Sequence, residues 1–511
     1  MLHFICKPNR HDSRIEGKIF IGCVENVMKC RWIVWLCGLQ GLARELCECR
    51  QDKRIWNAKK GEKNMKKWLS LILVGVLALT FTSVAFAEEE YEGTLRMMGP
   101  GLFADVGEDG VTDLVSGLEK PGYSELIALF NAEYPNVKVE IEAIPWDSWQ
   151  AKVQAAVAGE QVDLVLHGAT TTEVVMDLTE YLAGDPELAA VLTATDPRRT
   201  DESNYDKLAI TGIPYTVGIY YAALDTKIFE HYGVEVPTAE WTWDDLLAIA
   251  QQLTGTDPVT GTQTYGVKPF ISNDSSIWKS YMSYCFAKGI ENFTMAPNKF
   301  DVTFNFTTEA GISAFQFMKD LIDCTPAGYL EGAGGELFGQ EGNDVAICLA
   351  EGPEGMYRNL VAYGTADEYV FLPLPVQETG VAATSGVPGD NNMAIAVNAA
   401  RPDLAWLFIR WINTSEEAQD WILRCGVTPC STIGQAKMDE SAPYREAVLK
   451  TMEGYPDNFY YAGGPYWDNS YGNSNSVLCS NLASLFSGSI TAEECAQNVQ
   501  AGLEEWQSLN G

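Results

Sequence analysis

The chain has 511 residues, and its 35 Lys and Arg residues against 69 Asp and Glu residues give a formal net charge of −34. From residue 88 onward the balance is 20 basic to 62 acidic residues, a net charge of −42. Such a surface argues against nucleic acid or an anionic membrane as a partner, because both carry the same sign of charge. A solvated acidic surface explains the excess most simply, and a cationic ligand is the alternative.

The first 87 residues differ from the rest of the chain. Residues 1–64 hold six of the 13 cysteines and 13 of the 35 Lys and Arg residues. From Met65, two lysines and an apolar run lead to small residues at Ala85 and Ala87, so 65–87 are predicted to be an export signal peptide. Because a signal peptide belongs at a true N-terminus, we predict that translation starts at Met65 and that the upstream region is mis-translated. A genuine N-terminal extension is the alternative.

Cysteine usage after the predicted cleavage site bears on location and on metal binding. No cysteine follows the site directly, so we expect a chain without a lipid anchor, soluble in a periplasm or outside the cell. Seven cysteines remain, and Cys425 and Cys430 are close enough in sequence to form a bridge. Buried free thiols explain them equally well. No Cys/His spacing indicates a metal site, and no cofactor is expected.

About 420 exported residues suit two α/β lobes better than one ordinary domain. Apolar strand patterns alternate with helical patterns through the first part of this region. Such alternation predicts a largely parallel sheet, with ligands bound outside the carboxyl ends of its strands. The predicted strands cover 93–98, 137–144 and 162–168, and the predicted helices cover 124–135 and 146–160. The Gly- and Asp-rich segment 103–122 is assigned to no element.

The stretch 210–246 organises the rest of the chain. It starts with an apolar, β-branched and aromatic run that is interrupted by glycine and proline, as expected of a strand that leaves one compact body and enters another. Asp225 is placed to cap a short helix that ends at Gly233. A second helix, with Thr242 as its cap, presents an apolar stripe that ends at Leu253.

Three motifs of this stretch occur in the same order in a known family. They are GIPY at 212–215, LDTKIF at 224–229 and WTWDDL at 241–246. The chain resembles the carbohydrate-binding solute-binding proteins of ABC importers, the maltose-binding-protein-like family, and further matching segments extend over nearly all of 91–511. The resemblance implies an α/β fold of the type II periplasmic-binding-protein class, with two lobes, a hinge and a ligand cleft between the lobes.

The resemblance also implies boundaries and a function. Lobe 1 is expected to comprise 88–213 and 393–445, and lobe 2 to comprise 214–392 and 446–511. The expected protein is a monomer and not an enzyme; it captures a carbohydrate, by expectation an oligosaccharide, and delivers it to the transmembrane subunits of an ABC permease.

Sugar recognition requires flat aromatic side chains and hydrogen-bonding groups in a concave site. The candidates lie at strand ends, on the two expected crossings between the lobes, and in an aromatic- and amide-rich segment near the C-terminus. The predicted ligand-binding residues are Trp146, His167, Thr170, Tyr215, Gly218, Tyr220, Trp278, Glu354, Asp390, Asn391, Asn392, Trp467, Asp468 and Asn475.

Several of these candidates have a structural explanation of equal weight. His167 is as well explained as a structural histidine, and Trp278 as a residue of a helix core. Glu354 could act only on the start of its helix, and the segment 389–392 has the composition of a simple turn. Gly218 stands where the maltose-binding branch has an acidic sugar contact.

Two other classes of function remain open from the sequence. One is a binding protein for a cationic ligand such as a polyamine, or for a peptide, which the net charge of −42 suggests. The other is a secreted glycosidase that uses a pair of carboxylates. The second is disfavoured because motifs such as HExxH and GxSxG do not occur.

Overall fold

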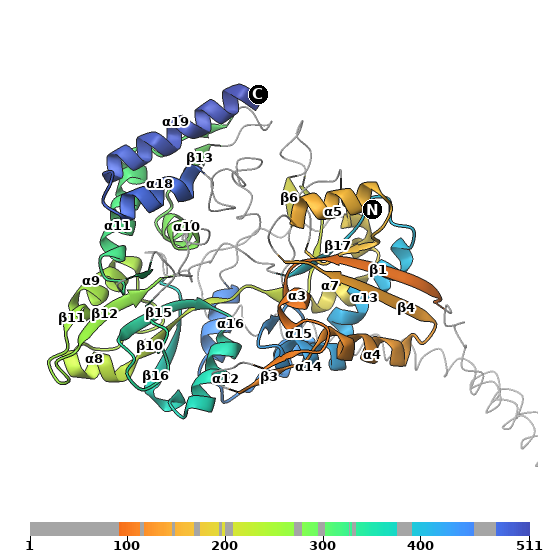
Figure 1. Ribbon diagram of the computed structural model, residues 1–511, viewed down its shortest axis with the longest axis horizontal. Helices are drawn as coiled ribbons and strands as arrows, with labels where there is room; N and C mark the ends of the chain where they lie inside the picture. The colour runs from red at the N-terminus through yellow and green to blue at the C-terminus, as the bar shows by residue number, and fades with distance from the viewer. Residues whose placement is uncertain are drawn as a thin grey trace, which may run out of the picture. The chain divides into compact units, whose positions relative to one another are not determined.

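We describe the protein from a computed structural model (Figure 1). The described residues are 91–112, 117–145, 149–167, 174–193, 197–199, 208–269, 278–294, 302–326, 328–329, 334–375, 391–453 and 477–510. All of them belong to the second of two units of the chain, Glu89–Gly511. The segments predicted as an upstream region (1–64) and a signal peptide (65–87) therefore lie outside the described residues.

The first of two five-stranded sheets has the order β4-β1-β5-β17-β8 (Figure 1). Its strands are β1 (Gly93–Gly99), β4 (Val137–Ala143), β5 (Leu164–Val165), β8 (Ile213–Pro214) and β17 (Asn392–Ile395). β1 runs parallel to both β4 and β5, whereas β17 runs antiparallel to β5 and to β8. The largely parallel sheet predicted from the alternation of strands and helices is confirmed.

Helices cover both faces of this sheet because neighbouring residues of a strand point to opposite faces. Met97 of β1 enters a core formed with α3, α4, α6, α7, α13 and α14, whereas Met98 packs against a second core built on α5. The helices are α3 (Leu102–Val106), α4 (Tyr123–Glu133), α5 (Trp149–Ala158), α6 (Thr179–Ala183), α7 (Pro186–Val191), α13 (Pro402–Thr414) and α14 (Glu416–Arg424).

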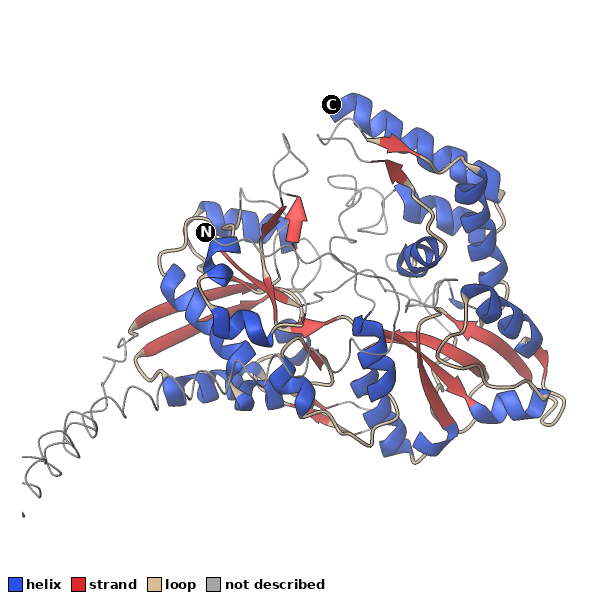
Figure 2. Ribbon diagram, turned by 180° about the vertical axis from the view of Figure 1, so that it is seen from behind, coloured by secondary structure: helices blue, strands red, loops and turns tan. Residues whose placement is uncertain are grey.

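The second sheet has the order β11-β12-β15-β10-β16 and mixes strand directions. β12 runs parallel to β15, and β10 runs antiparallel to both β15 and β16. Figure 2 shows the strands of the two sheets as separate groups flanked by helices. The strands are β10 (Tyr220–Asp225), β11 (Gly255–Thr256), β12 (Gln263–Lys268), β15 (Val345–Glu351) and β16 (Tyr369–Pro373).

Alternate residues of the central strand β10 fill two cores. Tyr220, Ala222 and Leu224 belong to the larger core, which contains residues of α8–α11, α18 and α19. Tyr221 and Ala223 belong to the other, with residues of α12 and α16. The helices are α8 (Thr226–Tyr232), α9 (Trp243–Leu253), α10 (Trp278–Ala287), α11 (Glu309–Ile322), α12 (Pro353–Tyr363), α16 (Arg445–Glu453), α18 (Val477–Phe486) and α19 (Ala492–Asn510).

The chain passes between the two sheets at the place that the sequence predicts. After β8 in the first sheet it forms β9 (Thr216–Val217), and it then enters β10 of the second sheet. β9 pairs with β18 (Thr428–Pro429), which follows α14. A return crossing joins β16 to β17. The stretch beginning at 210 thus carries the chain from one sheet to the other, and the predicted boundaries of two lobes stay predictions.

Local capping explains the bounds of the two helices that follow this crossing. The Asp225 carboxylate accepts hydrogen bonds from the backbone N–H groups of Lys227 and Ile228, and Gly233 ends α8 in the left-handed conformation with φ of 67°. Thr242 and Asp245 form a capping box at the start of α9. These caps confirm the predicted helix boundaries.

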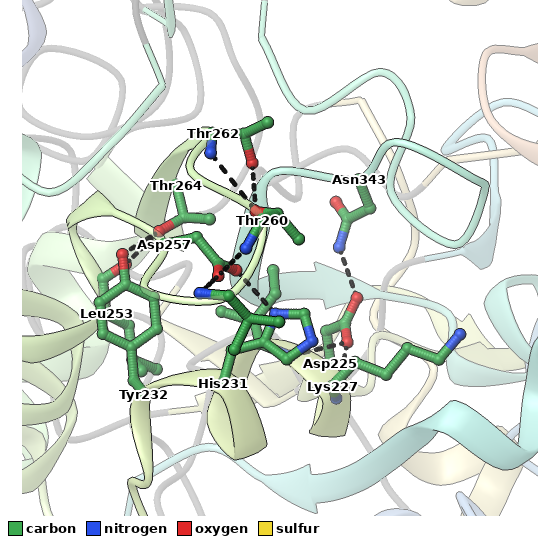
Figure 3. Close-up of polar contacts among 12 residues, drawn as sticks. Asp225, Lys227, His231, Tyr232, Leu253, Asp257, Thr260, Thr262, Thr264 and Asn343 are labelled. Atoms are coloured by element: carbon green, nitrogen blue, oxygen red, sulfur yellow. Dashed lines mark hydrogen bonds and ion pairs between the residues drawn. The ribbon is translucent and has the colours of Figure 1, made fainter.

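Both ends of α8 are also tied to neighbouring elements (Figure 3). At its start, Asp225 Oδ2 accepts hydrogen bonds from Asn343 Nδ2 at 2.8 Å and from the Tyr369 hydroxyl at 3.0 Å. At its end, His231 Nδ1 lies 2.7 Å from Asp257 Oδ2 (Figure 3). The helix is therefore held in position by one carboxylate at each end.

The segment 103–122, to which the sequence assigned no element, forms most of α3 and a small hairpin. Trp421 of α14 donates a hydrogen bond from Nε1 to the Gly122 carbonyl at 3.1 Å, which seats the segment on the first sheet's helices. The remaining elements are β2 (Val111–Thr112) with β3 (Glu119–Lys120), β6 (Pro197–Arg199) with β7 (Leu208–Ile210), β13 (Phe293–Thr294) with β14 (Thr303–Phe304), η2 (Ala366–Glu368) and α15 (Thr432–Ala436).

All seven cysteines after residue 64 lie in the described part of the chain and are buried, and no disulfide joins them there, Cys425 and Cys430 included. Of the two explanations open from the sequence, the structure therefore agrees with buried thiols and not with a Cys425–Cys430 bridge. None of the helices in the described part of the chain combines the length and the apolar composition needed to cross a bilayer. Within the same residues, no group of three or more His, Cys, Asp or Glu side chains is arranged to hold a metal ion.

Candidate ligand-binding site

The carboxyl ends of three parallel strands meet at one edge of the first sheet. The Ile144 amide, just after β4, donates to the Gly99 carbonyl of β1 at 3.0 Å, and the Leu166 amide, just after β5, donates to the Met98 carbonyl at 2.8 Å. These bonds hold side by side the chain segments that follow the three strands. In α/β sheets this edge is where ligands bind.

A hollow of about 390 Å³ opens at this edge. Its lining combines small and apolar groups with one carboxyl and one phenol group, which suits a ligand that carries both apolar faces and hydroxyls. The lining residues are Ala104, Asp105, Gly107, Tyr123, Ala143 and Pro145. Pro145 directly precedes Trp146, a predicted stacking residue that lies outside the described residues.

Burial raises the pKa of the Asp105 carboxyl above its ordinary value, and the positive charge of Lys120 acts in the opposite direction. Burial likewise raises the pKa of the Tyr123 hydroxyl, with the negative charges of Glu108 and Asp109 adding to the effect. The Tyr123 hydroxyl therefore stays a hydrogen-bond donor at neutral pH. Together with the Asp105 carboxyl, it gives the hollow a donor and an acceptor.

Sequence reasoning missed Asp105 and Tyr123. The available signal was the Gly-Pro-Gly motif at 99–101, which ends β1 and is followed directly by α3. A polar residue just after a strand's carboxyl end is a candidate by the same rule that selected Trp146. The low complexity of the segment 103–122 concealed this signal.

His167 lies two residues after the end of β5 at the same sheet edge and is half-buried. Its ring meets Trp149 edge-on, with ring centroids 5.2 Å apart. Trp149, the first residue of α5, itself packs in the core that α5 covers. His167 is thus positioned by a core residue at the candidate site, and its contact with a ligand stays a prediction.

Asn391 and Asn392, at the end of the second crossing, are both buried. The Asn391 amide oxygen accepts a hydrogen bond from the Leu102 N–H at 3.0 Å, and its Nδ2 donates to Thr216 Oγ1 at 3.0 Å. Asn391 thereby ties the start of α3 to the first crossing. These contacts give Asn391 a structural role, and ligand binding by either amide stays a prediction.

Tyr215, Gly218 and Tyr220 on the first crossing are buried. Tyr215 is 0% exposed and packs edge-on against Phe103 with ring centroids 6.0 Å apart. Tyr220 is 1% exposed and belongs to the larger core of the second sheet. Packing accounts for both rings in this structure, and their role toward a ligand remains a prediction.

Glu354 occupies the first turn of α12, after Gly352 in the left-handed conformation and Pro353. Its Oε2 atom is buried and has no hydrogen-bond partner among the described residues. Burial raises the pKa of the Glu354 carboxyl to about 7; the charge of Arg358 lowers it and that of Asp439 raises it further. This carboxyl therefore changes its charge near neutral pH.

The remaining predicted residues cannot be placed at the site. Trp278 is the first residue of α10. Six others lie outside the described residues: Trp146, Thr170, Asp390, Trp467, Asp468 and Asn475. Their roles stay predictions.

Comparison with known proteins identifies the family. The family model of the bacterial extracellular solute-binding proteins matches residues 112–419, more than half of the chain. The chain belongs to this family. A binding protein of Brucella abortus (strain 2308) is 23% identical to this solute-binding protein over 392 residues, which cover 73% of this chain and 84% of the relative. An uncharacterised lipoprotein of Streptomyces antibioticus is 28% identical over 134 residues, 26% of this chain and 30% of that protein.

Solved structures establish the fold of this solute-binding protein. An ABC transporter solute-binding protein of Agrobacterium radiobacter K84, in complex with ribitol, has a TM-score of 0.61 at 17% identity and covers 81% of this chain and 99% of its own. The Listeria monocytogenes protein Lmo0181, in complex with cycloalternan, has a TM-score of 0.58 at 17% identity; the match covers 82% of this chain and 100% of the Listeria chain. The maltose-bound T. maritima MalE3 has a TM-score of 0.58 at 16% identity; the match covers 81% of this chain and 99% of the MalE3 chain. The predicted type II periplasmic-binding-protein fold is confirmed.

Proposed function

We propose that this solute-binding protein captures a carbohydrate, an oligosaccharide by expectation, and delivers it to the transmembrane subunits of an ABC permease. The observation that carries the proposal is the hollow at the carboxyl edge of the first sheet. It places the Asp105 carboxyl and the Tyr123 hydroxyl beside the chain that leads to Trp146. A hydroxyl-rich ring with an apolar face matches this combination of groups.

Three structural neighbours hold ribitol, cycloalternan and maltose, which supports a polyol or saccharide as the ligand class. The two sheets would form the two lobes, with a hinge at the crossings near 210–217 and 383–392. Hinge closure would enclose the ligand in a cleft and create the form that the permease recognises. The mature protein would act as an exported monomer, in the periplasm or outside the cell, without catalysing a reaction.

The test is a thermal-shift screen of the exported protein against mono-, di- and oligosaccharides, polyamines and short peptides. A ligand that binds only the folded state stabilises it, by about 2.7 kcal/mol at a concentration of 100 times Kd. We expect the midpoint to rise with one class of saccharide. A rise only with polyamines or peptides would overturn the ligand class.

Variants of the hollow link the ligand to the proposed site. We expect Asp105→Ala to weaken saccharide binding by about tenfold or more, because a hydrogen bond to a charged group is worth about 1.5–3 kcal/mol. Glu119→Ala is the matched control, since Glu119 is an exposed carboxylate of β3 that does not line the hollow. Equal affinities of the two variants, measured by titration calorimetry, would place the saccharide elsewhere.

A cationic or peptide ligand is the second candidate, favoured by the net charge of −42 from residue 88 onward. Attraction between opposite charges is screened by salt, whereas binding of a neutral sugar is nearly independent of it. Titrations at low and high salt therefore separate the two candidates. A steep loss of affinity with salt would favour the charged ligand.

A further inference from the structure

The N-terminal half of α12, a helix that packs on the second sheet, contacts the end of α14, a helix that packs on the first sheet. Arg358 Nη1 donates a hydrogen bond to the Arg424 carbonyl at 2.5 Å. One residue pair brings the two backbones close together: a Cβ added to Gly355 would lie 3.2 Å from the Gly426 carbonyl oxygen. Glycine at both positions thus permits an approach that larger residues would hinder.

Apolar packing extends the same contact. Met356 of α12 and Leu423 of α14 both pack against the core that lies behind the second sheet. Further along the two helices, Leu360 belongs to that core, and Trp421 to the core of the first sheet. The contact between 354–358 and 423–426 therefore links helices whose main packing is on different sheets.

Glu354 immediately precedes Gly355 of this contact, and the charge of Arg358, which bonds to the end of α14, acts on its carboxyl. Its buried Oε2 has no hydrogen-bond partner among the described residues, so ionisation leaves a poorly compensated negative charge. The charged groups that act on it are Arg358 of its own helix and Asp439 of the segment after α15. Two further cationic residues lie near the contact: Lys120 of β3, whose side chain approaches Gly426, and Arg424 of α14, whose carbonyl binds Arg358.

The charges around Glu354 do not offset the effect of burial on the pKa of its carboxyl. Burial is the largest effect and raises the pKa to about 7; Arg358 lowers it and Asp439 raises it. Arg358 is further engaged by the Arg424 carbonyl, and Arg424 by Glu125 and Asp420. The carboxyl is thus more stable here in its neutral form than it is in water.

We propose that Glu354 makes the contact between α12 and α14 depend on protonation: the neutral carboxyl stabilises the contact, and the ionised carboxylate weakens it. The carboxyl binds its proton more tightly in the contact than in water. The contact is therefore strongest below pH 4.5, the ordinary pKa of a glutamate, and it weakens as the pH rises toward about 7. The functional consequence rests on the proposed function, in which the two sheets belong to lobes that move relative to each other. Ligand affinity would then depend on pH near neutrality.

Hydrogen exchange followed by mass spectrometry tests this inference on the ligand-free exported protein. After correction for the intrinsic effect of pH on exchange, we expect peptides covering 355–362 and 423–430 to be at least about tenfold better protected at pH 5 than at pH 8. Glu354→Gln, which mimics the neutral carboxyl, should be protected at both pH values. Glu309→Gln, an exposed glutamate in the first turn of α11, is the matched control and should behave as the wild type.

A second variant tests the contact itself. Gly355→Ala places a methyl group against the Gly426 carbonyl and favours helix formation, so the protein should fold while the contact weakens at both pH values. A pH response that is the same in wild type and Glu354→Gln would overturn the inference. Unchanged protection in Gly355→Ala would also overturn it, because the contact would then not account for the protection.

The outcome is separable from that of the proposed function. Saccharide binding without a Glu354-dependent pH response would remove the inference and leave the receptor function in place. A Glu354-dependent response in a protein that binds no saccharide would retain the proton-dependent contact and reject the proposed ligand.

Discussion

Asp163 shows how one buried carboxylate holds several chain segments together. It is 0% exposed and accepts hydrogen bonds from Arg96 Nε and Nη2, each at 2.9 Å. It also accepts from the backbone amides of Ala400 at 2.8 Å and Arg401 at 3.2 Å. Burial by itself raises the pKa of Asp163, but the hydrogen bonds from Arg96 and Arg401 lower it below the ordinary value of 3.8. The carboxylate joins β1, the start of β5 and the turn before α13.

We predict that Asp163→Ala lowers the free energy of unfolding by about 3–5 kcal/mol at pH 7, because it leaves Arg96 without its buried partner. Glu140→Ala is the control, since Glu140 pairs with Lys138 at the surface and such pairs contribute about 0–1 kcal/mol. Urea unfolding measures both. Similar losses in the two variants would contradict the prediction.

The pH dependence of the Asp163 contribution follows from the direction of its pKa shift. Because the folded-state pKa lies below the ordinary 3.8, the stabilisation is fully present above that value and is lost as the pH falls through the folded-state pKa. We therefore expect the difference between wild type and Asp163→Ala to shrink in acid, provided that both stay folded. A difference that grows in acid would show that the carboxylate is not the stabilising group.

At the scale of elements, α8 and α9 are capped in two different ways. Thr242 caps α9 at a half-buried position, with Asp245 completing the capping box. Asp225 caps α8 at a buried position and also binds Asn343 and Tyr369. The first cap stabilises one helix end, whereas the second also satisfies polar groups from two other elements.

We predict unequal losses when these caps are removed. Thr242→Ala should cost about 1 kcal/mol of stability, the usual value for a lost cap. Asp225→Ala should cost about 2–4 kcal/mol, because it also leaves the Asn343 amide and the Tyr369 hydroxyl without this acceptor. Denaturant unfolding of the two variants provides the comparison. Equal losses would show that the additional bonds of Asp225 contribute nothing to stability.

At the scale of the whole molecule, the seven cysteines of the region after residue 64 are distributed over both sheets' cores and are all buried. Burial raises the pKa of Cys285, Cys425 and Cys495 to about 12 and that of Cys348 to about 11. Thiols in such surroundings stay protonated at neutral pH and react slowly.

We predict that the native exported protein shows almost no reaction with a thiol reagent such as dithionitrobenzoate at pH 8. In guanidinium chloride all seven thiols should react, because unfolding exposes them. If two fewer thiols than expected react in the denatured protein, the protein contains a disulfide bridge. Cys425 and Cys430 are then the first pair to examine by mass spectrometry. Rapid reaction of the native protein would contradict the burial of these side chains.

Much of the fold could be predicted because its signals are local. Asp225, Gly233 and Thr242 mark helix ends through bonds to residues two to four positions away, or through their own backbone conformation. The alternation of strands and helices up to His167 predicted the parallel part of the first sheet. The candidate site was harder to predict from the sequence: Trp146, which follows Pro145 of the hollow in the sequence, is among the predicted contacts, but Asp105 and Tyr123 are not.

The sequence by itself therefore determined the class of fold, the main helix boundaries and the crossing between two sheets, since each depends on the periodicity and capping of a short stretch. Tertiary structure decided which polar residues line a hollow and which serve the architecture. The Asn391 side chain accepts a hydrogen bond from Leu102 across 289 positions, and Glu354 Oε2 is buried without a hydrogen-bond partner among the described residues. Such contacts leave no pattern in the neighbouring sequence, because burial and partners are set by chain segments that meet only after folding.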